Sequence, residues 1–404
     1  MTKRLIFSSL LASSFCAPGV ASAYEWLPPW MPDTAAVPFA FSSSTLGNTI
    51  GVAGLLKGLG QPQAGLIGAG LISDKGSNMT FIGYNNFQVG NAWLLGFDAY
   101  NASYSDYIYH LGSAGDNDSL HSQKTVTDAK EAQYHFTMRY IIPWGAAAFK
   151  GARAAYEPKR RIQGASPATS GISTIKFEPF LSERSLSSSN DSAPDSTWGV
   201  NLGFEWDNRN DVRNPSLGAK LKLNIAHAPD SGNDNTWTKV EIEQSHYFSL
   251  GKVDDVFSRQ VLAFDMYVAD TPTWNRCGSG TCERPPEYAG VSLGGLYHLR
   301  GYSANRYHGR SAVHYSLEYR VMPEWQPLQS WPIFNWYDVP WWQWVAFVDA
   351  GRVADEFSIQ ELHRDMKYNL GGGIRFQVEG IVVRTEMAFG DEENMFRVMI
   401  NQPF

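Results

Sequence analysis

Apolar and polar side chains alternate along much of the second half of the chain. In residues 313–321 every odd-numbered residue is apolar or aromatic and every even-numbered one is polar. The same alternation occupies residues 366–378, 381–389 and, further upstream, 198–206. A period of two residues is typical of β-strands, because successive side chains point to opposite faces of a sheet. Each of these segments is therefore predicted to be a strand with one apolar and one polar face.

The whole chain yields sixteen such segments, which predicts an all-β protein. Segment 148–158 is an alternative to 36–43 as one of the sixteen. Residues 105–129 and 185–195 are rich in Ser, Asp and Asn and are expected to be loops. The sixteen expected strands are 36–43, 47–57, 64–73, 78–87, 91–104, 130–141, 172–184, 196–207, 217–228, 236–248, 256–270, 312–322, 344–351, 367–378, 380–389 and 395–404.

Alternation alone fits both a soluble β-sandwich and a barrel, but three features favour a barrel in a membrane. Charged residues occupy the middle of the polar faces, which suits a watery lumen. Aromatic residues gather at strand ends, as in Trp341-Trp342-Gln343-Trp344, and the last expected strand finishes on Phe404. Outer-membrane barrels carry such aromatic girdles at both interfaces. Lipid offers no partners for backbone N–H and C=O groups, so the sheet must close on itself. We therefore expect a 16-stranded antiparallel transmembrane β-barrel.

The first residues have the layout of a secretory signal peptide. Lys3 and Arg4 precede an apolar stretch, and Ala21-Ser22-Ala23 has the small-residue pattern of a cleavage site. A membrane-anchoring helix is the alternative, but the apolar stretch is too short to cross roughly 30 Å of hydrocarbon. The expected organisation is a signal peptide at 1–23, a short periplasmic segment at 24–35 and an outer-membrane barrel domain at 36–404.

Composition narrows the possible functions. Aromatic residues make up 14% of the chain, yet no segment after residue 23 approaches the 18 consecutive apolar residues of a membrane-spanning helix. The chain has 33 basic and 40 acidic residues, a net charge of −7, which argues against a nucleic-acid partner. Outer-membrane lipid is the partner that the apolar strand faces require.

After the signal segment only two cysteines remain, Cys277 and Cys282. They lie in the short Gly/Ser/Thr-containing sequence Cys277-Gly-Ser-Gly-Thr-Cys282 of an exported protein, which favours a local disulfide that fixes a loop. Zinc binding is the alternative, but no second Cys/His pair lies nearby at ligand spacing.

Several short motifs follow one another along the second half of the chain. Leu299-Arg300-Gly301-Tyr302 lies in a long connection at about residues 271–311, Glu318 lies in the strand after it, and Phe347-Val348-Asp349-Ala350-Gly351 lies in the next strand. Together they resemble the (V/L)-R-G-(F/Y) loop, the acidic strand position and the F-x-D-x-G strand of the BamA/TamA outer-membrane assembly-factor superfamily, also called bacterial surface antigens.

Two further segments are similar to the same family. Asp207-Asn-Arg-Asn-Asp211, followed by Asn214-Pro-Ser-Leu-Gly218, resembles its D-x-R-(D/N)…P-x-x-G periplasmic turn, and Asn401-Gln-Pro-Phe404 resembles its terminal strand. The resemblance covers about residues 198–404. The family resemblance implies that the loop folds into the lumen, where its arginine meets the two acids.

Odd- and even-numbered side chains of a strand point to opposite faces, and this alternation places the two acids where such a contact requires them. In the strand that contains Asp349, the residues Gln343, Val345, Phe347, Asp349 and Gly351 share one face, while Trp342, Trp344, Ala346 and Val348 share the lipid face. Glu318 falls on the polar face of the preceding strand. We therefore expect Arg300 to bridge Glu318 and Asp349, with Gly301 allowing a tight turn and Tyr302 adjacent. The alternative is that Arg300 lies in solvent and the two acids merely line water.

Nothing in the sequence indicates catalysis. The Glu318/Asp349 pair could in principle act as general acid and base, but no Gly-x-Ser-x-Gly elbow, metal-ligand spacing or phosphate-binding loop accompanies it. His298 is expected to be a packing neighbour of Arg300 and not a base. No cofactor and no metal are expected.

The resemblance implies a role in assembling or translocating proteins or lipids at the outer membrane. Such a role would require weak hydrogen bonding between the first and last strands, at the seam of the barrel. Pro403 has no backbone N–H and would remove one hydrogen-bond donor near this seam. Family members of the BamA and TamA types also carry periplasmic domains that receive client proteins, and residues 24–35 are too short for one. Client proteins or a separate periplasmic partner therefore remain open possibilities. A passive or gated pore, or a structural surface barrel, is the alternative.

Overall fold

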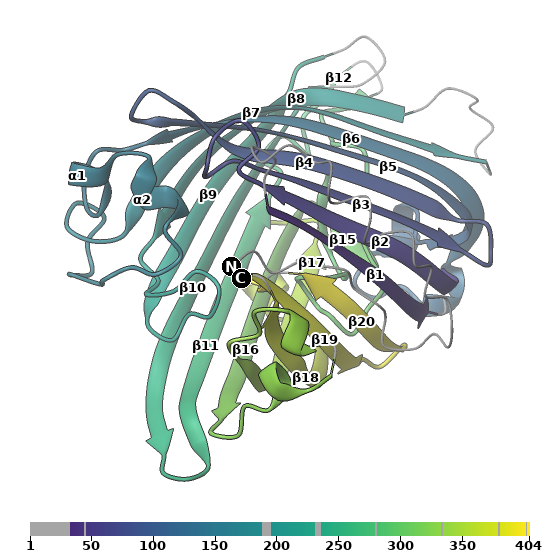
Figure 1. Ribbon diagram of the computed structural model, residues 1–404. Helices are drawn as coiled ribbons and strands as arrows, with labels where there is room; N and C mark the ends of the chain where they lie inside the picture. The colour runs from purple at the N-terminus through teal and green to yellow at the C-terminus, as the bar shows by residue number, and fades with distance from the viewer. Residues whose placement is uncertain are drawn as a thin grey trace.

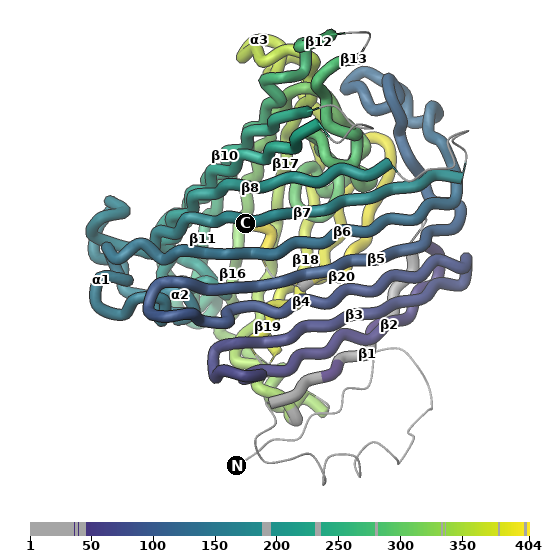
Figure 2. The backbone as a smooth tube through the Cα atoms, turned by 90° about the horizontal axis from the view of Figure 1, so that it is seen from above, coloured from purple at the N-terminus to yellow at the C-terminus, as the bar shows by residue number. Residues whose placement is uncertain are grey.

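The protein is a large antiparallel β-barrel, seen in a computed structural model that describes residues 33–43, 46–187, 195–230, 236–278, 281–332, 334–378, 380–400 and 402–404 (Figure 1). Sixteen strands follow one another in chain order around the sheet, each hydrogen-bonded to the next. Figure 2 shows β1 to β8 side by side in this order across the near wall. The strands are β1 (Asp33–Ser43), β2 (Gly47–Lys57), β3 (Gly65–Ser73), β4 (Asn78–Val89), β5 (Trp93–Tyr109), β6 (Thr125–Ile141), β7 (Ile172–Leu186), β8 (Asp195–Asp207), β9 (Gly218–Ala228), β10 (Trp237–Val253), β11 (Phe257–Asp270), β16 (Ser311–Pro323), β17 (Trp342–Ala354), β18 (Lys367–Val378), β19 (Ile381–Phe389) and β20 (Asn394–Ile400).

The barrel exposes apolar side chains and buries charged ones. In β16 Leu317 is 46% exposed, whereas its neighbour Glu318 is 0% exposed. In β17 Val348 is 51% exposed, whereas Asp349 is 0% exposed. A soluble sandwich would show the opposite arrangement, with apolar residues inside. The outward apolar band and polar interior are those of a transmembrane barrel, and this confirms the expected fold class.

The barrel has two different ends. We call the end that holds the 208–217 connection between β8 and β9 the turn end, and the opposite end, which holds the 110–124 connection between β5 and β6, the loop end. At the loop end the long connection 271–310 turns back into the lumen. It contains two small hairpins, β12 (Cys277–Gly278) with β13 (Thr281–Cys282) and β14 (Val291–Leu293) with β15 (Tyr307–Gly309).

All helices of the described residues are single turns in connections. They are α1 (Ala147–Lys150), α2 (Arg153–Tyr156), α3 (Ile359–Leu362), η2 (Gly112–Gly115), η3 (His121–Gln123), η4 (Leu328–Ser330) and η5 (Phe334–Trp336). None of the described helices is long and apolar enough to cross a membrane.

The alternative assignment of 148–158 as a strand is wrong, because this segment contains α1 and α2. Ala147, Ala152 and Ala154 pack on Leu94 and Ile141 at the turn end of β5 and β6. Small alanine side chains allow this close cap on the strand ends. The segment 36–43 is instead part of β1, which begins at Asp33 and therefore includes the last residues of the expected N-terminal segment. The expected signal peptide and residues 24–32 lie outside the described residues.

The expected loop at 105–129 is shorter than predicted. β5 continues to Tyr109 and β6 begins at Thr125, so this hairpin projects beyond its neighbours in the sheet. An irregularity between Tyr104 and Tyr107 interrupts the ladder and breaks the strict alternation. A bulge of this kind interrupts the two-residue period, and for this reason the alternation did not predict the extension.

Trp342 lies on the lipid face by parity but is not exposed. Its side chain is buried because Trp325, from the 324–341 connection, covers it. The indole Nε1 of Trp342 donates to the backbone oxygen of Trp325 at 3.0 Å, and the two rings meet edge to face. The connection after β16 therefore folds over the aromatic strand end, whereas Trp344, two residues along the same strand, remains half exposed.

The ends of the sheet differ from the expectation in one important respect. β1 and β20 lie next to each other at the seam, with Cα atoms within 8 Å. β20 ends at Ile400, however, and Phe404 does not continue the strand to an outer aromatic girdle. Phe404 is instead buried with Tyr247, Val261 and Ala263.

Candidate functional site

The 271–310 connection packs into the lumen through an apolar hairpin. Val291 and Leu293 of β14 and Tyr307 of β15 are fully buried, as are Leu299 and Tyr302 between them. They form one core with residues of β11, β16 and β17. Burying these side chains stabilises the hairpin by about 25 cal/mol for each Å² of apolar surface removed from water. The hairpin is thus held against the barrel wall before any charged contact is considered.

The tip of this hairpin follows an unusual backbone path. Gly294, Gly295 and Leu299 all have left-handed φ angles, of 102°, 117° and 47°. Gly301 was expected to supply such a turn, but its φ is not in this region. A Cβ at Gly301 would lie 2.5 Å from Cβ of Asn369. Gly301 is therefore needed for a close approach to the wall, and the glycines before it make the turn.

Arg300 is fully buried and bound by the two acids that the sequence singled out. Its Nε and backbone N donate to Oδ2 of Asp349 at 3.0 and 3.1 Å, and Nη2 donates to Oδ1 at 2.8 Å. Nη1 donates to Oε1 of Glu318 at 2.6 Å. These are charge-assisted bonds, with a two-pronged contact to Asp349. The structure excludes the alternative in which Arg300 lies in solvent.

Neighbouring strands hold both the arginine and its main acid in place. Ser316 lies directly opposite Asp349 in the sheet; its hydroxyl donates to Oδ1 of Asp349 at 2.8 Å and accepts from Nη2 of Arg300 at 2.9 Å. Asn369 lies opposite Asp349 on the other side and donates to Oδ2 at 3.0 Å. The ring of Phe347 lies 3.6 Å below the guanidinium, a cation–π contact.

Tyr302 and Gly351 complete the fit of the loop against the wall. The Tyr302 hydroxyl donates to the backbone oxygen of Tyr368 at 3.1 Å. A Cβ at Gly351 would lie 3.0 Å from Cδ1 of Leu293 and 3.0 Å from the backbone oxygen of Val313. Glycine in the F-x-D-x-G strand therefore leaves room for the incoming hairpin.

The charged site is larger than the sequence motifs indicated. Arg375 of β18 donates to both oxygens of Glu318 at 2.8 and 2.9 Å and to Glu386 of β19 at 2.6 Å. Arg320 donates through Nε to Glu318 at 2.8 Å, and Arg384 donates to Glu386 at 3.3 Å. The cluster, which we call the luminal ion cluster, consists of Arg300, Arg320, Arg375, Arg384, Glu318, Asp349 and Glu386.

Alternation placed Arg375, Arg384 and Glu386 on polar faces, but the sequence could not show that they meet. Arg375 and Arg384 are direct cross-strand neighbours, an arrangement in which like charges repel. Glu386 lies between them in space and binds both guanidinium groups. The network depends on the register of four strands and on a loop that enters from outside the sheet.

His298 is a packing neighbour, as expected. Its ring stacks on Tyr267 with centroids 4.1 Å apart and lies 5.0 Å from the ring of His314.

The loop is also bound to the last hairpin of the barrel. Arg397 of β20 donates to backbone oxygens of Arg300 and Tyr302 at 2.8 and 2.7 Å. Arg306, fully buried, donates to both oxygens of Glu392 in the β19–β20 turn. The same loop therefore contacts the wall at Asp349 and the final hairpin at two places.

The Asp207 turn is stabilised by its own ion pair. Nε and Nη2 of Arg209 donate to the two oxygens of Asp207 at 2.9 and 3.0 Å, and Arg160 adds a second guanidinium at 3.0 Å. Gly218 has a φ of 104°, and a Cβ there would lie 2.1 Å from the backbone oxygen of Asn208. These contacts fix the shape of the turn.

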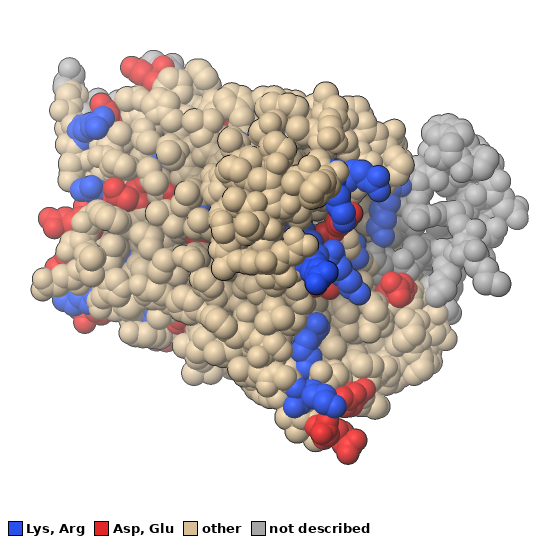
Figure 3. Space-filling view, turned by 90° about the vertical axis from the view of Figure 1, so that its left-hand side faces the viewer, with Lys and Arg blue, Asp and Glu red and all other residues tan. Residues whose placement is uncertain are grey.

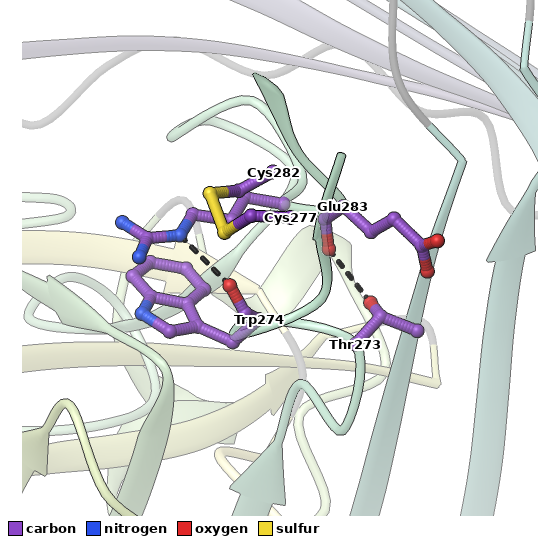
Figure 4. Close-up of a disulfide and its surroundings, with 6 residues drawn as sticks. Thr273, Trp274, Cys277, Cys282 and Glu283 are labelled. Carbon is purple, nitrogen blue, oxygen red and sulfur yellow. Dashed lines mark hydrogen bonds between the residues drawn. A yellow bond between two sulfur atoms is a disulfide. The ribbon is translucent and has the colours of Figure 1, made fainter. Parts of the chain in front are cut away.

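Cys277 and Cys282 form the disulfide that the sequence indicated (Figure 4). It closes the β12–β13 hairpin at the exposed part of the 271–310 connection. Next to it, Arg284 donates to the backbone oxygen of Trp274 at 2.9 Å, and Thr273 donates to that of Glu283 at 2.8 Å. The disulfide therefore stabilises the base of the loop and not the Arg300 tip.

Part of the lumen beside the loop is open. A cavity of about 550 Å³ lies between His298 and the opposite wall, lined by residues of β4 to β11, most of them polar. Its charged residues are Arg139, Lys176, Glu205, Lys222, Glu241 and Glu243. Among the described residues, no group of three or more His, Cys, Asp or Glu side chains is placed to hold a metal ion.

Comparison with known proteins points to one family. The profile of the Omp85 superfamily domain matches residues 62–404. No curated protein sequence matches the chain.

Solved structures with a similar fold include BamA from Haemophilus ducreyi lacking POTRA domains 1–3, with a TM-score of 0.51 at 13% identity. CdiB from Acinetobacter baumannii gives 0.52 at 13%, and CdiB from Escherichia coli gives 0.54 at 11%. Each match covers 91% of this chain and, in the same order, 69%, 59% and 61% of the other chain. At these identities the likeness is one of fold, and the chain spans about two thirds or less of the length of its structural neighbours.

Proposed function

This chain belongs to the Omp85 superfamily, and we propose that it is an integral outer-membrane barrel that assists the assembly or translocation of proteins or lipids. The observation that carries the proposal is the luminal ion cluster, which binds the Arg300 loop to the inner wall. A charged loop fixed against the inner wall narrows the path through the barrel. It sets whether the interior and the seam stay closed.

The seam between the first and last strands supports a gate. β1 has eleven residues, whereas β20 has only seven, so β20 cannot match β1 along its whole length. Pro403 follows β20 and has no N–H to donate. Each unpaired backbone group facing hydrocarbon costs several kcal/mol, so a short seam is the weakest part of the barrel. We propose that the seam opens sideways to admit a polypeptide strand or a lipid.

The loop contacts suggest how the seam is controlled. Arg397 of β20 binds the loop backbone, and Arg306 of the loop binds Glu392 in the preceding turn. The final hairpin is thus tied to the same loop that Glu318 and Asp349 hold. Release of the loop would remove these restraints from the hairpin beside the seam.

The partners of the barrel are part of the proposal. We propose that outer-membrane lipid surrounds the apolar strand faces and that exported client proteins, or a separate periplasmic protein that delivers them, approach the turn end. A cleaved signal peptide at 1–23 would bring the chain to the outer membrane. We assign no catalytic role to any residue.

The proposal is tested by closing the seam covalently in living cells. Cysteine pairs are introduced across β1 and β20 in the chain that keeps its Cys277–Cys282 disulfide. The abundance of outer-membrane proteins and lipids is then measured with and without reductant. Loss of one class under oxidising conditions, restored by reductant, is the expected result. A cysteine pair across β18 and β19, which already form a complete ladder, is the matched control. Normal abundance with a fully formed seam disulfide would contradict a lateral gate.

A gated pore is the second candidate, and the open cavity favours it. The 550 Å³ cavity is lined by charged and polar side chains, as a water-filled path would be. Planar-bilayer recordings separate the two functions. A pore would conduct with the seam disulfide formed, and substitution of Lys222 by Gln would change its ion selectivity.

A further inference from the structure

Phe404 lies across the lumen from the strand that it follows. β20 is separated from β10 along the sheet by five intervening strands, yet the Phe404 ring lies 6.2 Å from the Tyr247 ring of β10. The Tyr247 hydroxyl donates to the backbone oxygen of Phe404 at 2.7 Å. Phe404 is only 5% exposed. The segment 402–404 therefore leaves the seam and crosses the interior.

The receiving surface is a cluster of buried residues on the inner wall. Tyr247 lies opposite Ala263 in the β10–β11 ladder, and Ala263 lies opposite Glu318 in the β11–β16 ladder. Val261 lies opposite Arg320 in the same β11–β16 ladder, two residues along from the Ala263–Glu318 pair and therefore on the same face. Tyr247, Val261, Ala263 and Arg320 thus form one contiguous patch, which we call the Phe404 pocket.

The Phe404 pocket binds an aromatic side chain through a cation–π contact as well as through apolar packing. The guanidinium of Arg320 lies 5.2 Å from the Phe404 ring and 5.3 Å from the Tyr247 ring. Arg320 is 1% exposed, and its Nη1 has no hydrogen-bond partner among the described residues. A buried cation with an unused donor gains from a facing aromatic ring. The pocket therefore suits a phenylalanine better than an aliphatic residue.

Gln402 makes a second set of contacts to the same region. Its Oε1 accepts from Nη1 of Arg375 at 2.7 Å, and its Nε2 donates to the backbone oxygen of Arg213 in the β8–β9 connection at 2.9 Å. Arg375 is a member of the luminal ion cluster. The segment is thus bound to the cluster through Arg375 and to the turn end through Arg213.

Both arginines that contact the segment also bind Glu318, the acid that holds Arg300. Arg320 donates to Oε2 of Glu318 at 2.8 Å, and Arg375 donates to both of its oxygens. If the segment leaves, Arg320 loses its facing ring and Arg375 loses the Gln402 acceptor. Glu318 is then held less firmly, because two of its guanidinium partners are less constrained.

We propose that the Phe404 pocket is a binding site for a phenylalanine side chain, that Phe404 fills it in the closed barrel, and that its occupancy holds the Arg300 loop in place through Glu318. The ligand class is a short peptide segment that carries a phenylalanine after a glutamine and a proline. The site regulates the loop on which the proposed function rests. An incoming segment of the same kind would compete with Phe404 for the pocket.

The test measures release of the loop in purified protein, so it does not depend on any cellular activity. Ser303 in the loop is buried, and in protein prepared without residues 1–23, and so without Cys16, a Ser303→Cys substitution places a single free thiol there while Cys277 and Cys282 stay disulfide-bonded. The rate at which a maleimide modifies this thiol reports how often the loop leaves the wall. A second reporter, Ser173→Cys, is buried at the turn end of β7 and away from the loop.

The informative variant is Phe404→Ala, and its matched control is Phe389→Ala on the exposed face of β19. Phe404→Ala is expected to raise the modification rate at position 303 at least about tenfold, which corresponds to roughly 1.4 kcal/mol. The rate at position 173 is expected to stay constant. Phe389→Ala is expected to change neither rate.

Addition of a peptide in trans completes the test. A soluble peptide of sequence acetyl-Asn-Gln-Pro-Phe is expected to slow modification at position 303 in the Phe404→Ala protein, and acetyl-Asn-Gln-Pro-Ala is not. Tyr247→Phe, which removes only the hydroxyl, provides a milder variant if Phe404→Ala fails to fold. An unchanged rate at position 303 in a folded Phe404→Ala barrel, or equal effects of both peptides, would overturn the proposal. Either result would leave the lateral-gate hypothesis untouched, because that hypothesis is tested at the seam.

Discussion

The Arg300 contact leads to a quantitative prediction about stability. In the Arg300→Gln variant, Asp349 loses the two hydrogen bonds that the guanidinium donates to it and Glu318 loses one, while both carboxylates stay buried. The backbone N–H at position 300 survives the substitution, so two side-chain bonds to Asp349 and one to Glu318 are removed. Removal of one partner from a buried ion pair typically costs about 3–5 kcal/mol, since it leaves an uncompensated charge.

The structure indicates which end of that range applies. Glu318 keeps two guanidinium partners, Arg320 and Arg375, and is therefore still compensated. Among the described residues, Asp349 keeps the neutral side-chain donors Ser316 and Asn369 besides the backbone N–H at position 300. The cost should come mainly from Asp349, and we expect a loss of about 3 kcal/mol in the free energy of unfolding. Arg300→Gln combined with Asp349→Asn should recover part of that loss, because the second change removes the buried charge.

The assay is urea unfolding of the purified barrel in lipid vesicles, followed by tryptophan fluorescence. Arg310→Gln is the matched control, because Arg310 pairs with Asp270 at 3.1 Å but is about one-fifth exposed. That pair should contribute less than about 1 kcal/mol, as partly exposed ion pairs do. If Arg300→Gln unfolded within about 0.5 kcal/mol of the unmodified protein, the view that the buried cluster holds the loop would be refuted.

Three further changes have expected outcomes. Burial, reinforced by the nearby Arg306 cation, lowers the pKa of His110 to about 4, so the folded protein binds fewer protons at His110 than the unfolded chain does. The free energy of unfolding should therefore fall as the pH drops from about 6.5 towards 4. His110→Gln should remove this dependence in acid-unfolding curves. Gly301→Ala should cost about 1–3 kcal/mol in thermal or urea unfolding, because its Cβ would meet the wall at 2.5 Å, whereas Gly278→Ala, with nothing within 4 Å, should be neutral. Replacing Cys277 and Cys282 by Ser should increase proteolysis of the loop base while changing barrel unfolding by less than about 2 kcal/mol, since the bond closes a loop with a separation of only five residues; a collapse of the whole barrel would contradict this local role.

Alternation in the sequence determined the wall of this protein. A period of two residues assigns each side chain to a face without knowledge of distant contacts, which is why Glu318, Phe347 and Asp349 could be placed inside from sequence alone. The short spacing of Cys277 and Cys282 likewise restricted them to a local bond. The disposition of the strands around the barrel followed because lipid forbids an open sheet edge.

Contacts between distant segments were decided only by the tertiary structure. Alternation predicted polar faces for Arg375, Arg384 and Glu386, but their meeting with Arg300 depends on strand register and on a loop that re-enters the lumen. Trp342 is on the lipid face, as alternation predicted, but the 324–341 connection covers it. The path of that connection has no two-residue period from which it could be predicted.

Phe404 shows the limit most clearly. Its aromatic side chain at the end of an alternating segment indicated a lipid girdle, yet it crosses the barrel to Tyr247 and Arg320. Local pattern fixes which side of the sheet a residue faces, because that depends on backbone geometry alone. Where a residue without a strand partner goes depends on the free energy of sites elsewhere in the molecule, and only the folded barrel creates those sites.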